Sequence, residues 1–478
     1  MSGYFVENFG CRATQADGAA LERQFEERGL VRAATAREAE LVVLNTCTVT
    51  AAADQDARAA IRRVQQQNPK AKIVVTGCYA QRVPEEIAAL PGVSCVVGNS
   101  HKHKLAGIVL DSHVALSGTF IPLGTLSAEA RSPEPEARLF VSDIFAHTEL
   151  LAAPVFDAAN ERTRPNLKVQ DGCDNRCSFC VIPYVRGQSR SLPLSEIIRE
   201  VNALVDGGYR EVVISGINLG RWGRDLNARP GLPQPEAQSP KPAFEHLIRT
   251  ILRETRLEKL RISSVEPMDW TDELIALVTE SPRIAKHAHV PMQSGSDSVL
   301  RRMHRKYRPW HYREKIEKIR TAMPAAAIGA DVMVGFPGET DAEFEATRRM
   351  IEELPFTYLH VFTYSPRPGT PAASMRNQLP VQLARERSRI LRELAAEKKL
   401  AFMRSFVGQT IEAITLQQCG AGVARTEALT DNYLKLQLDG CLEANRWVCA
   451  KVKSVDTGAL VGSCVGSPEF GPRARGSI

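Results

Sequence analysis

Three cysteines, Cys173, Cys177 and Cys180, follow a short apolar stretch with the spacing C-x3-C-x2-C. Three thiolates can bind three irons of a four-iron cluster and leave the fourth iron open to a small ligand or a substrate. A structural zinc site instead needs four protein ligands, and no second cysteine or histidine pair lies near this triplet in the sequence. The spacing therefore favours an iron–sulfur cluster with an open iron, with structural zinc and unreactive thiols as the alternatives.

Three further cysteines each stand at the end of a strand-like run. Cys11 follows YFVENFG, Cys47 ends LVVLNTC and Cys78 ends KIVVTGC, and a helix-like segment comes after each. The carboxyl ends of parallel strands share one edge of a sheet, so these three thiols can converge on a second metal cluster. The alternative is that each is a small buried apolar residue. Cys95, at the start of SCVVGN, is interpreted as a core residue.

Composition narrows the class of protein. The chain has 478 residues, enough for roughly three domains of ordinary size. Its hydrophobic fraction of 44% and charged fraction of 24% are typical of soluble proteins, and no apolar run is long enough to span a bilayer. The first residues show no secretory pattern, so we expect a cytoplasmic protein, with its 11 cysteines reduced or bound to metal.

The charge pattern is compatible with a polyanionic partner. The net charge of +6 is only mildly basic and does not decide the matter. The segment RRMHRKYRPWHYREK, from Arg301 to Lys315, alternates basic side chains with Tyr307, Trp310 and Tyr312. Such a segment can hold phosphates and stack bases. Its alternative is an exposed helix face that the tryptophan anchors to the core.

Hydrophobic periodicity divides the chain into three domains. Residues 1–112 alternate strand and helix patterns and predict an open parallel α/β domain, followed by a connector over 113–154 with one short strand at RLFVSDIF. Residues 155–400 contain six strand-like runs separated by helical segments, which predicts a partial (β/α)6 barrel with active groups at the carboxyl ends of its strands. Residues 403–468 contain five short strands and predict a small β-barrel. The stretch NARPGLPQPEAQSPKP is expected to be a surface loop.

The stretch KVQDGCDNRCSFCVIPYVRGQSRS, from Lys168 to Ser191, resembles the radical S-adenosylmethionine (SAM) methylthiotransferases, which insert sulfur and a methyl group into tRNA or a ribosomal protein. NTCTVTAAAD, VVTGCYAQRVPEE and GINLGRWGRDL are most similar to the branch that acts on threonylcarbamoyladenosine in tRNA. The other branches act on isopentenyladenosine in tRNA or on an aspartate of a small-subunit ribosomal protein. One departure is Thr14, which stands where that branch often has an amide side chain. The carboxyl-terminal segment resembles the RNA-binding TRAM module, an OB-like domain, through Thr430-Asp431-Asn432-Tyr433.

The resemblance implies two [4Fe–4S] clusters and two molecules of SAM. The cluster at Cys173, Cys177 and Cys180 would cleave one SAM to the radical that removes hydrogen from C2 of the adenine at position 37. The cluster at Cys11, Cys47 and Cys78 would hold the sulfur, and the second SAM would supply the methyl group. Residues in places where relatives contact SAM are Phe179, Gly216, Asn218 and Gly335. Tight turns are the alternative explanation for the glycines.

The implied partners are a tRNA substrate, an electron donor of the flavodoxin or ferredoxin type, and a source of sulfur; no membrane is expected. The competing hypothesis of a different class is a non-catalytic RNA-binding protein whose cysteines hold structural metal. Metal content separates the two, because the enzyme requires about eight irons per chain and the binding protein requires zinc.

Overall fold

The computed structural model describes residues 3–110, 137–147, 150–151, 164–226, 243–416 and 425–467. The chain forms two compact units. The first comprises Met1–Ala153, Gly172–Asn175 and Cys180–Arg190. The second comprises Pro154–Asp171, Arg176–Phe179 and Ser191–Ile478.

The first unit is built on a parallel sheet with the strand order β2-β1-β3-β4-β5-β6. The expected open parallel α/β sheet is confirmed, and the short strand expected in RLFVSDIF is β6 at its edge. The strands are β1 (Gly3–Asn8), β2 (Val31–Arg32), β3 (Leu41–Thr46), β4 (Lys72–Gly77), β5 (Val93–Gly98) and β6 (Arg138–Phe140).

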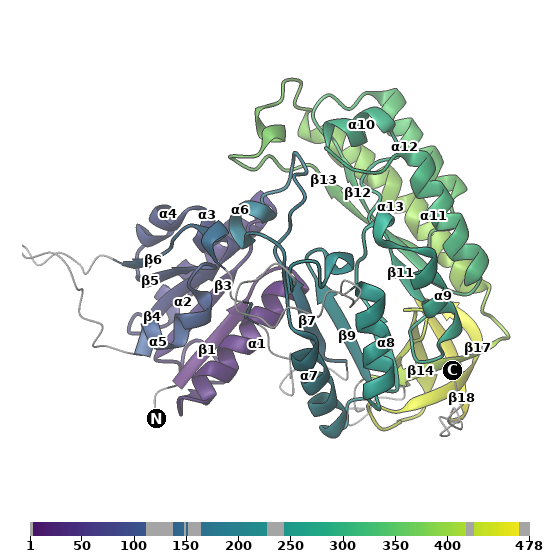
Figure 1. Ribbon diagram of the computed structural model, residues 1–478, viewed down its shortest axis with the longest axis horizontal. Helices are drawn as coiled ribbons and strands as arrows, with labels where there is room; N and C mark the ends of the chain where they lie inside the picture. Colours follow the sequence, from purple (N-terminus) through teal and green to yellow (C-terminus); the bar gives the residue numbers. More distant parts are fainter. Residues whose placement is uncertain are drawn as a thin grey trace, which may run out of the picture. The chain divides into compact units, whose positions relative to one another are not determined.

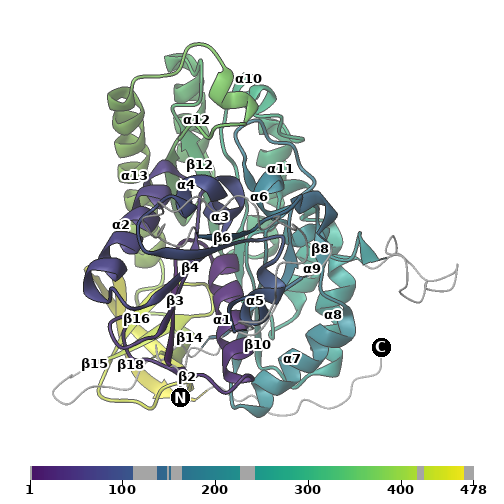
Figure 2. The ribbon, with the colours of Figure 1, turned by 90° about the vertical axis from the view of Figure 1, so that its left-hand side faces the viewer.

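Helices cover both faces of this sheet, which is why every residue of β3 is buried and its first four residues, LVVL, are apolar. Ala57, Ile61 and Val64 of α2 pack against one face. Leu21 and Phe25 of α1 pack against the other, in a core that also holds Cys95 as expected. Figure 2 shows α1 and α2 on opposite sides of the sheet. The helices of this unit are α1 (Arg12–Glu26), α2 (Ala51–Gln67), α3 (Cys78–Arg82), α4 (Pro84–Ala88), α5 (Leu105–Leu110) and α6 (Ile182–Arg186), with 3-10 turns at Lys102–Lys104 and Ile144–Ala146.

The second unit contains the expected partial barrel. Six parallel strands follow one another as β7, β9, β10, β11, β12 and β13, with the short β8 beside β7. Isolated bridges, Leu260 to Ile284 and Ser264 to His289, join β10 to the β11 segment. The strands are β7 (Asn166–Asp171), β8 (Arg190–Ser191), β9 (Glu211–Gly216), β10 (Lys259–Ile262), β11 (His287–His289), β12 (Ala327–Val334) and β13 (Tyr358–Thr363).

Helices line the outer face of the partial barrel (Figure 1), and the outward side chains Ala288, Ile328 and Val332 are buried beneath them. The helices are α7 (Leu194–Asp206), α8 (Phe244–Glu254), α9 (Asp272–Glu280), α10 (Asp297–Arg302), α11 (Pro309–Ala322), α12 (Asp341–Glu353) and α13 (Val381–Arg404), with 3-10 turns at Leu219–Arg221, Pro267–Asp269 and Pro371–Ser374. The inward side chains of the strands are mostly polar, and those at the carboxyl ends face the side where a barrel enzyme has its active site.

The last part of the chain is a closed barrel of five strands in the order β14-β15-β16-β18-β17, which confirms the expected small β-barrel. All pairs are antiparallel except β16 with β18. Its core includes Ala413, Leu436 and Leu460. The strands are β14 (Thr410–Thr415), β15 (Arg425–Thr430), β16 (Lys435–Asp439), β17 (Trp447–Asp456) and β18 (Ala459–Gly466).

The segment Thr430–Tyr433 anchors this closed barrel to the amino-terminal ends of the partial-barrel strands. Arg261 of β10 is buried, donates to the carbonyl oxygens of Thr430 and Asp431, and pairs with Glu211 of β9 at 2.6 Å. Lys259 pairs with Asp431 at 3.1 Å. The Tyr433 ring lies 4.9 Å from the ring of His287. The four residues that carry the resemblance to TRAM therefore hold one barrel against the other.

The basic segment from Arg301 to Lys315 differs from both expectations. Tyr307 and Tyr312 are fully buried, and their hydroxyls donate to backbone carbonyls of Met292 and Val290, so the expectation that they stack bases is wrong. Trp310 is 56% exposed, so it does not anchor the segment to the core; the two buried tyrosines do so instead.

Two expectations fall mainly on residues that are not described. The proline-rich stretch, residues 227–242, lies outside the described residues, as does most of the expected connector over 113–154. Within the described part of the chain, no helix has the length and apolar character needed to cross a membrane.

Candidate cysteine sites

Cys11, Cys47 and Cys78 follow three neighbouring strands of the first unit. Cys11 comes shortly after β1, Cys47 directly after β3 and Cys78 directly after β4. These strands are adjacent and parallel, so their carboxyl ends lie at one edge of the sheet. The sheet thus brings together the ends that carry the three cysteines, while their role as cluster ligands stays a prediction.

The turn before Cys11 passes directly over Cys47. Gly10 has φ +97°, and a Cβ at this position would lie 2.6 Å from the Cys47 Cβ and 2.8 Å from its Sγ. Only glycine permits both this conformation and this approach. Cys11 is then the N-cap of α1, and Cys78 is the first residue of α3.

The three thiols influence one another electrostatically. The pKa of Cys47 is raised to about 11, chiefly by burial and also by the neighbouring thiols Cys78 and Cys11. A thiol must lose its proton to bind a metal, so metal binding at this edge would release protons. Among the described residues, no three His, Cys, Asp or Glu side chains lie close enough to hold a metal ion as they stand. If the three cysteines bind a cluster, as predicted, their thiols must come closer together, and sulfur donors suit iron–sulfur clusters.

Two buried basic side chains lie behind these cysteines. Lys102 and Arg186 each donate to the same carboxylate oxygen of Asp17 at 3.0 Å, and all three residues are at most 3% exposed. Arg186 also lies 3.4 Å from the Thr14 hydroxyl, which is 3.6 Å from the Cys11 Sγ. Since two cations share one carboxylate, the region favours additional negative charge, as thiolates or an anionic cluster would supply.

Cys173, Cys177 and Cys180 lie in the loop between β7 and α6. Gly172, with φ +72°, starts this loop, and a Cβ there would overlap the backbone carbonyl oxygen of Gln188. The backbone N–H of Cys173 donates to the carbonyl of Gly187 at 3.0 Å. The glycine therefore lets the start of the loop run against the chain that leaves α6, within the first unit.

Within the second unit, the middle of the loop is fixed by the segment after α10. Ser178 donates from its backbone N–H to Met303 and from its hydroxyl to the carbonyl of Arg302, at 3.1 and 2.7 Å. Arg305 Nη1 donates to the Cys177 Sγ at 3.3 Å. Arg305 is only 7% exposed and is held from its other nitrogens by Tyr307 and Glu266. A fixed cation thus faces one cysteine of the triplet.

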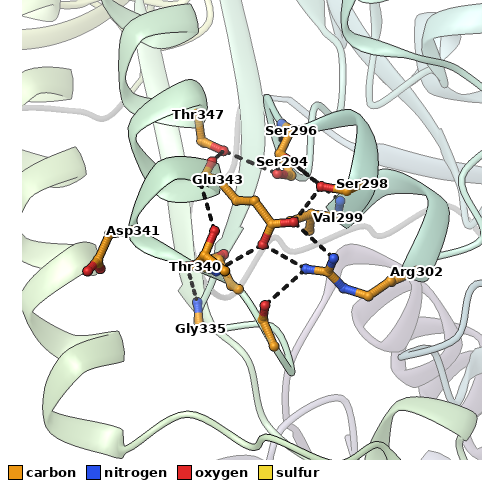
Figure 3. A network of polar contacts seen from close by, with 12 residues as sticks. Ser294, Ser296, Ser298, Val299, Arg302, Gly335, Thr340, Asp341, Glu343 and Thr347 are labelled. Carbon is orange, nitrogen blue, oxygen red and sulfur yellow. Dashed lines mark hydrogen bonds and ion pairs between the residues drawn. The ribbon is translucent and has the colours of Figure 1, made fainter.

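A polar network links α10 to the loop after β12 (Figure 3). Both terminal nitrogens of Arg302 bind the Glu343 carboxylate at 2.9 Å, and the Ser298 hydroxyl and Thr340 N–H also donate to it. Burial by itself raises the pKa of Glu343, but these hydrogen bonds outweigh it and lower the pKa to about 2. Because the Arg302 carbonyl also holds Ser178, the network connects the Cys177 loop to the loop at Gly335–Thr340.

Comparison with known proteins decides the family. Residues 3–98 match the family described as "Uncharacterized protein family UPF0004", and residues 167–351 match the Radical SAM superfamily. Over 92% of its length the chain is 36% identical to the threonylcarbamoyladenosine tRNA methylthiotransferase MtaB of Bacillus subtilis strain 168, of which the match covers 91%. The chain belongs to the radical-SAM methylthiotransferase family. It is a transferase, and the expected cofactors of this family, SAM and an iron–sulfur cluster, are confirmed at that level.

Other relatives of this methylthiotransferase fall in two branches. The Aquifex aeolicus protein with the same name, MtaB, is 34% identical over 92% of this chain, and the match covers 98% of that relative. The tRNA-2-methylthio-N(6)-dimethylallyladenosine synthase of Novosphingobium aromaticivorans is 35% identical over 86% of the chain and is covered to 85%. The radical SAM methyltransferase TsrM from Kitasatospora setae shares the fold, with a TM-score of 0.53 and 15% identity over 78% of this chain and 74% of its own.

In this methylthiotransferase, hydrogen bonds and close packing surround the four residues expected to contact SAM. Gln170 Oε1 accepts from the Asn218 N–H at 2.7 Å, and a Cβ at Gly216 would lie 2.8 Å from the same oxygen. Gly335 has φ +75° and faces Ala384 of α13. Phe179 packs beside Val299, Met303, Phe336 and Ala372. Close packing explains both glycines, and contact of the four with SAM stays a prediction.

Sequence reasoning missed several charged residues of these sites. In the sequence Arg305 stands out only as part of a basic segment, and Lys102, Asp17 and Arg186 do not stand out. Arg305, Lys102 and Arg186 come from segments remote in sequence from the cysteines they approach, and Asp17, although near Cys11 in sequence, is marked only by its contacts with Lys102 and Arg186, so spacing could not reveal them. The one signal was a charged residue within an apolar run, as in Arg186 of VIPYVRG.

Proposed function

We propose that this methylthiotransferase replaces the hydrogen on C2 of N6-threonylcarbamoyladenosine, at position 37 of tRNA, with a methylthio group. This nucleoside is chosen because the chain is similar to enzymes named for threonylcarbamoyladenosine. The similarity to the Bacillus subtilis relative extends over 450 residues. The match to the Novosphingobium aromaticivorans dimethylallyladenosine enzyme has a similar identity but extends over 415 residues.

The inner face of the partial barrel supports a polar substrate. His289 Nε2 lies 3.5 Å from Asp331 Oδ1, and the His289 ring lies 5.6 Å from the ring of His360. Tyr358 stacks with His289 at 5.9 Å on the same face. A threonylcarbamoyl group carries a carboxylate and a hydroxyl, which need hydrogen-bonding partners, whereas an isopentenyl group needs an apolar wall.

Two clusters would be held by two sets of cysteines: Cys11, Cys47 and Cys78 in one set, Cys173, Cys177 and Cys180 in the other. With SAM, such clusters supply the radical, sulfur and methyl chemistry that side chains cannot, since the aromatic C2–H has no usable acidity. The protein itself orients the reactants and tunes the electrostatic surroundings of the clusters. Arg305 directs a positive charge at the Cys177 sulfur, and the pair of Lys102 and Arg186 favours negative charge beside Cys11.

Further partners follow from this chemistry. Cleaving SAM requires an electron, which a flavodoxin or ferredoxin would deliver, and each turnover consumes a sulfur atom that a sulfur source must replace. We assign residues 1–112 to the first cluster, 155–400 to the radical-SAM core and 403–468 to a TRAM domain that binds RNA, with 113–154 as connector. The reaction would take place in the cytoplasm, where tRNA is found.

The test is mass spectrometry of nucleosides from a strain that lacks this gene and carries either the wild type, Cys177→Ala or Cys464→Ala. Cys464 is an exposed cysteine of β18 and serves as the matched control. The proposal expects methylthio-threonylcarbamoyladenosine with the wild type and the control, and none with Cys177→Ala. If methylthio-isopentenyladenosine is lost with the gene and restored by the wild type instead, the protein acts in the isopentenyladenosine branch. If neither nucleoside changes, the aspartate of the ribosomal protein or a non-catalytic, zinc-stabilised RNA-binding role replaces the proposal.

A further inference from the structure

A hollow of about 490 Å³ lies between the end of β13 and one face of α13. Thr363, the last residue of β13, forms one wall. The other wall is formed mainly by Arg385, Arg389 and Arg392. These residues recur at positions i, i+4 and i+7 of one helix, so their side chains lie side by side.

The three arginines differ in what already holds them. Arg389 pairs with both Glu386 and Glu393 at 2.7 Å. Arg392 donates to the carbonyl of Val361 at 3.1 Å, which leaves further guanidinium N–H groups available. Within the described ranges, Arg385 has no hydrogen bond or ion pair. The hollow therefore presents at least one unneutralised guanidinium.

The floor of the hollow is polar as well. Ser388 is 3% exposed and lines the hollow, and its hydroxyl finds no hydrogen-bond partner in the described part of the chain. A helix serine usually bonds a backbone carbonyl one turn back when it has no other partner. The wall contains three arginines and an unsatisfied hydroxyl but only one carboxylate, that of Glu393. It therefore suits an anion with several oxygens, such as a phosphate.

We propose that this hollow binds a backbone phosphate of the tRNA substrate. The identity of the RNA rests on the proposed function. RNA is favoured because β13 is the edge strand of its sheet among the described residues, and there Phe362 is 48% exposed and His360 is exposed as well. Flat rings on the inner face and arginines on the outer face of one strand match the two features by which proteins bind single-stranded RNA, base stacking and phosphate contacts. The hollow also lies at the carboxyl end of its strand, where the reaction site is expected.

The test measures binding of tRNA from the deletion strain to the full-length protein between 50 and 200 mM salt. Each single-strand phosphate that is neutralised contributes about 0.7 to the slope of log K against log salt, so Arg385→Gln with Arg392→Gln, which gives up the one bound phosphate, should lose roughly 2.6-fold less affinity over this range than the wild type. Arg385→Gln alone, which breaks no contact within the described ranges, should change the slope in the same direction and by no more than the double variant does.

The matched control is Arg249→Gln with Arg253→Gln on α8, which removes the same charge from another helix of the same unit. The proposal requires this control to keep the wild-type slope. An equal change in both double variants would show a general charge effect and overturn the proposal, as would an unchanged slope in the Arg385 variants. If the wild type binds no tRNA, the proposed function fails; if it binds and the slopes stay equal, only this inference fails.

Discussion

Arg305 Nη1 donates to the Sγ of Cys177 at 3.3 Å, from a guanidinium whose other nitrogens are held by Tyr307 and Glu266. The arrangement is rigid because Arg305 is buried and the Tyr307 hydroxyl is itself bonded to the carbonyls of Pro291 and Met292. Hydrogen bonds to cluster sulfurs are among the factors that set reduction potential. The contact would therefore give Arg305 a positioning and tuning role if Cys177 binds a cluster, as predicted.

Replacing Arg305 should lower the reduction potential of that cluster. Arg305→Gln removes a positive charge that favours the more negative, reduced state. The measurement is a redox titration followed by electron paramagnetic resonance, in a background where Cys11, Cys47 and Cys78 are alanine so that one cluster remains. Arg301→Gln, an exposed arginine of α10 paired with Asp297, is the control. An unchanged potential in Arg305→Gln with full iron content would refute the role.

Gly172 should tolerate no side chain. In Gly172→Ala the new Cβ would overlap the Gln188 carbonyl, and φ is +72°, so the cysteine loop must shift. We expect loss of iron at the triplet, measured as iron content after anaerobic reconstitution. Gly208→Ala is the matched control, since Gly208 has φ +87° but open space around it. That change should cost only about 1 kcal/mol of unfolding free energy and keep the iron. Equal iron in the two variants would contradict the account.

The Glu343 network should make stability depend on acid pH. The folded pKa of Glu343 is lowered to about 2 from the ordinary value of 4.5, so its contribution is present above pH 4.5 and is lost as the pH falls towards 2. The shift corresponds to at most about 3 kcal/mol at neutral pH. Urea unfolding of Glu343→Gln should therefore show a deficit at pH 7 that shrinks below pH 4.5. Glu353→Gln, at the last residue of α12, serves as the control. A deficit independent of pH would contradict the assignment.

Strand and helix periodicity predicted the fold well. The six strand-like runs of the partial barrel and the five of the closed barrel are all strands in the structure. Each run either alternates apolar and polar residues, as a half-buried strand does, or is mainly apolar, as a fully buried strand is. The neighbouring strand ends that carry Cys11, Cys47 and Cys78 could also be predicted, since they follow from the order of a parallel sheet. Arg305 and the Lys102, Asp17 and Arg186 group could not, because their contacts depend on tertiary packing. The interpretation in which Tyr307 and Tyr312 stack bases was wrong, because a basic segment does not show which of its side chains are buried.

The most direct test of the proposed function is turnover by the purified enzyme, reconstituted without oxygen and supplied with SAM, a reductant and a sulfur source. It is offered two tRNAs in parallel, one with threonylcarbamoyladenosine and one with isopentenyladenosine at position 37, and the nucleosides are analysed by mass spectrometry. The proposed function predicts a methylthio product from the first tRNA only, and none with Cys177→Ala. A product from the second tRNA alone, or no product from either with both clusters present, would contradict it.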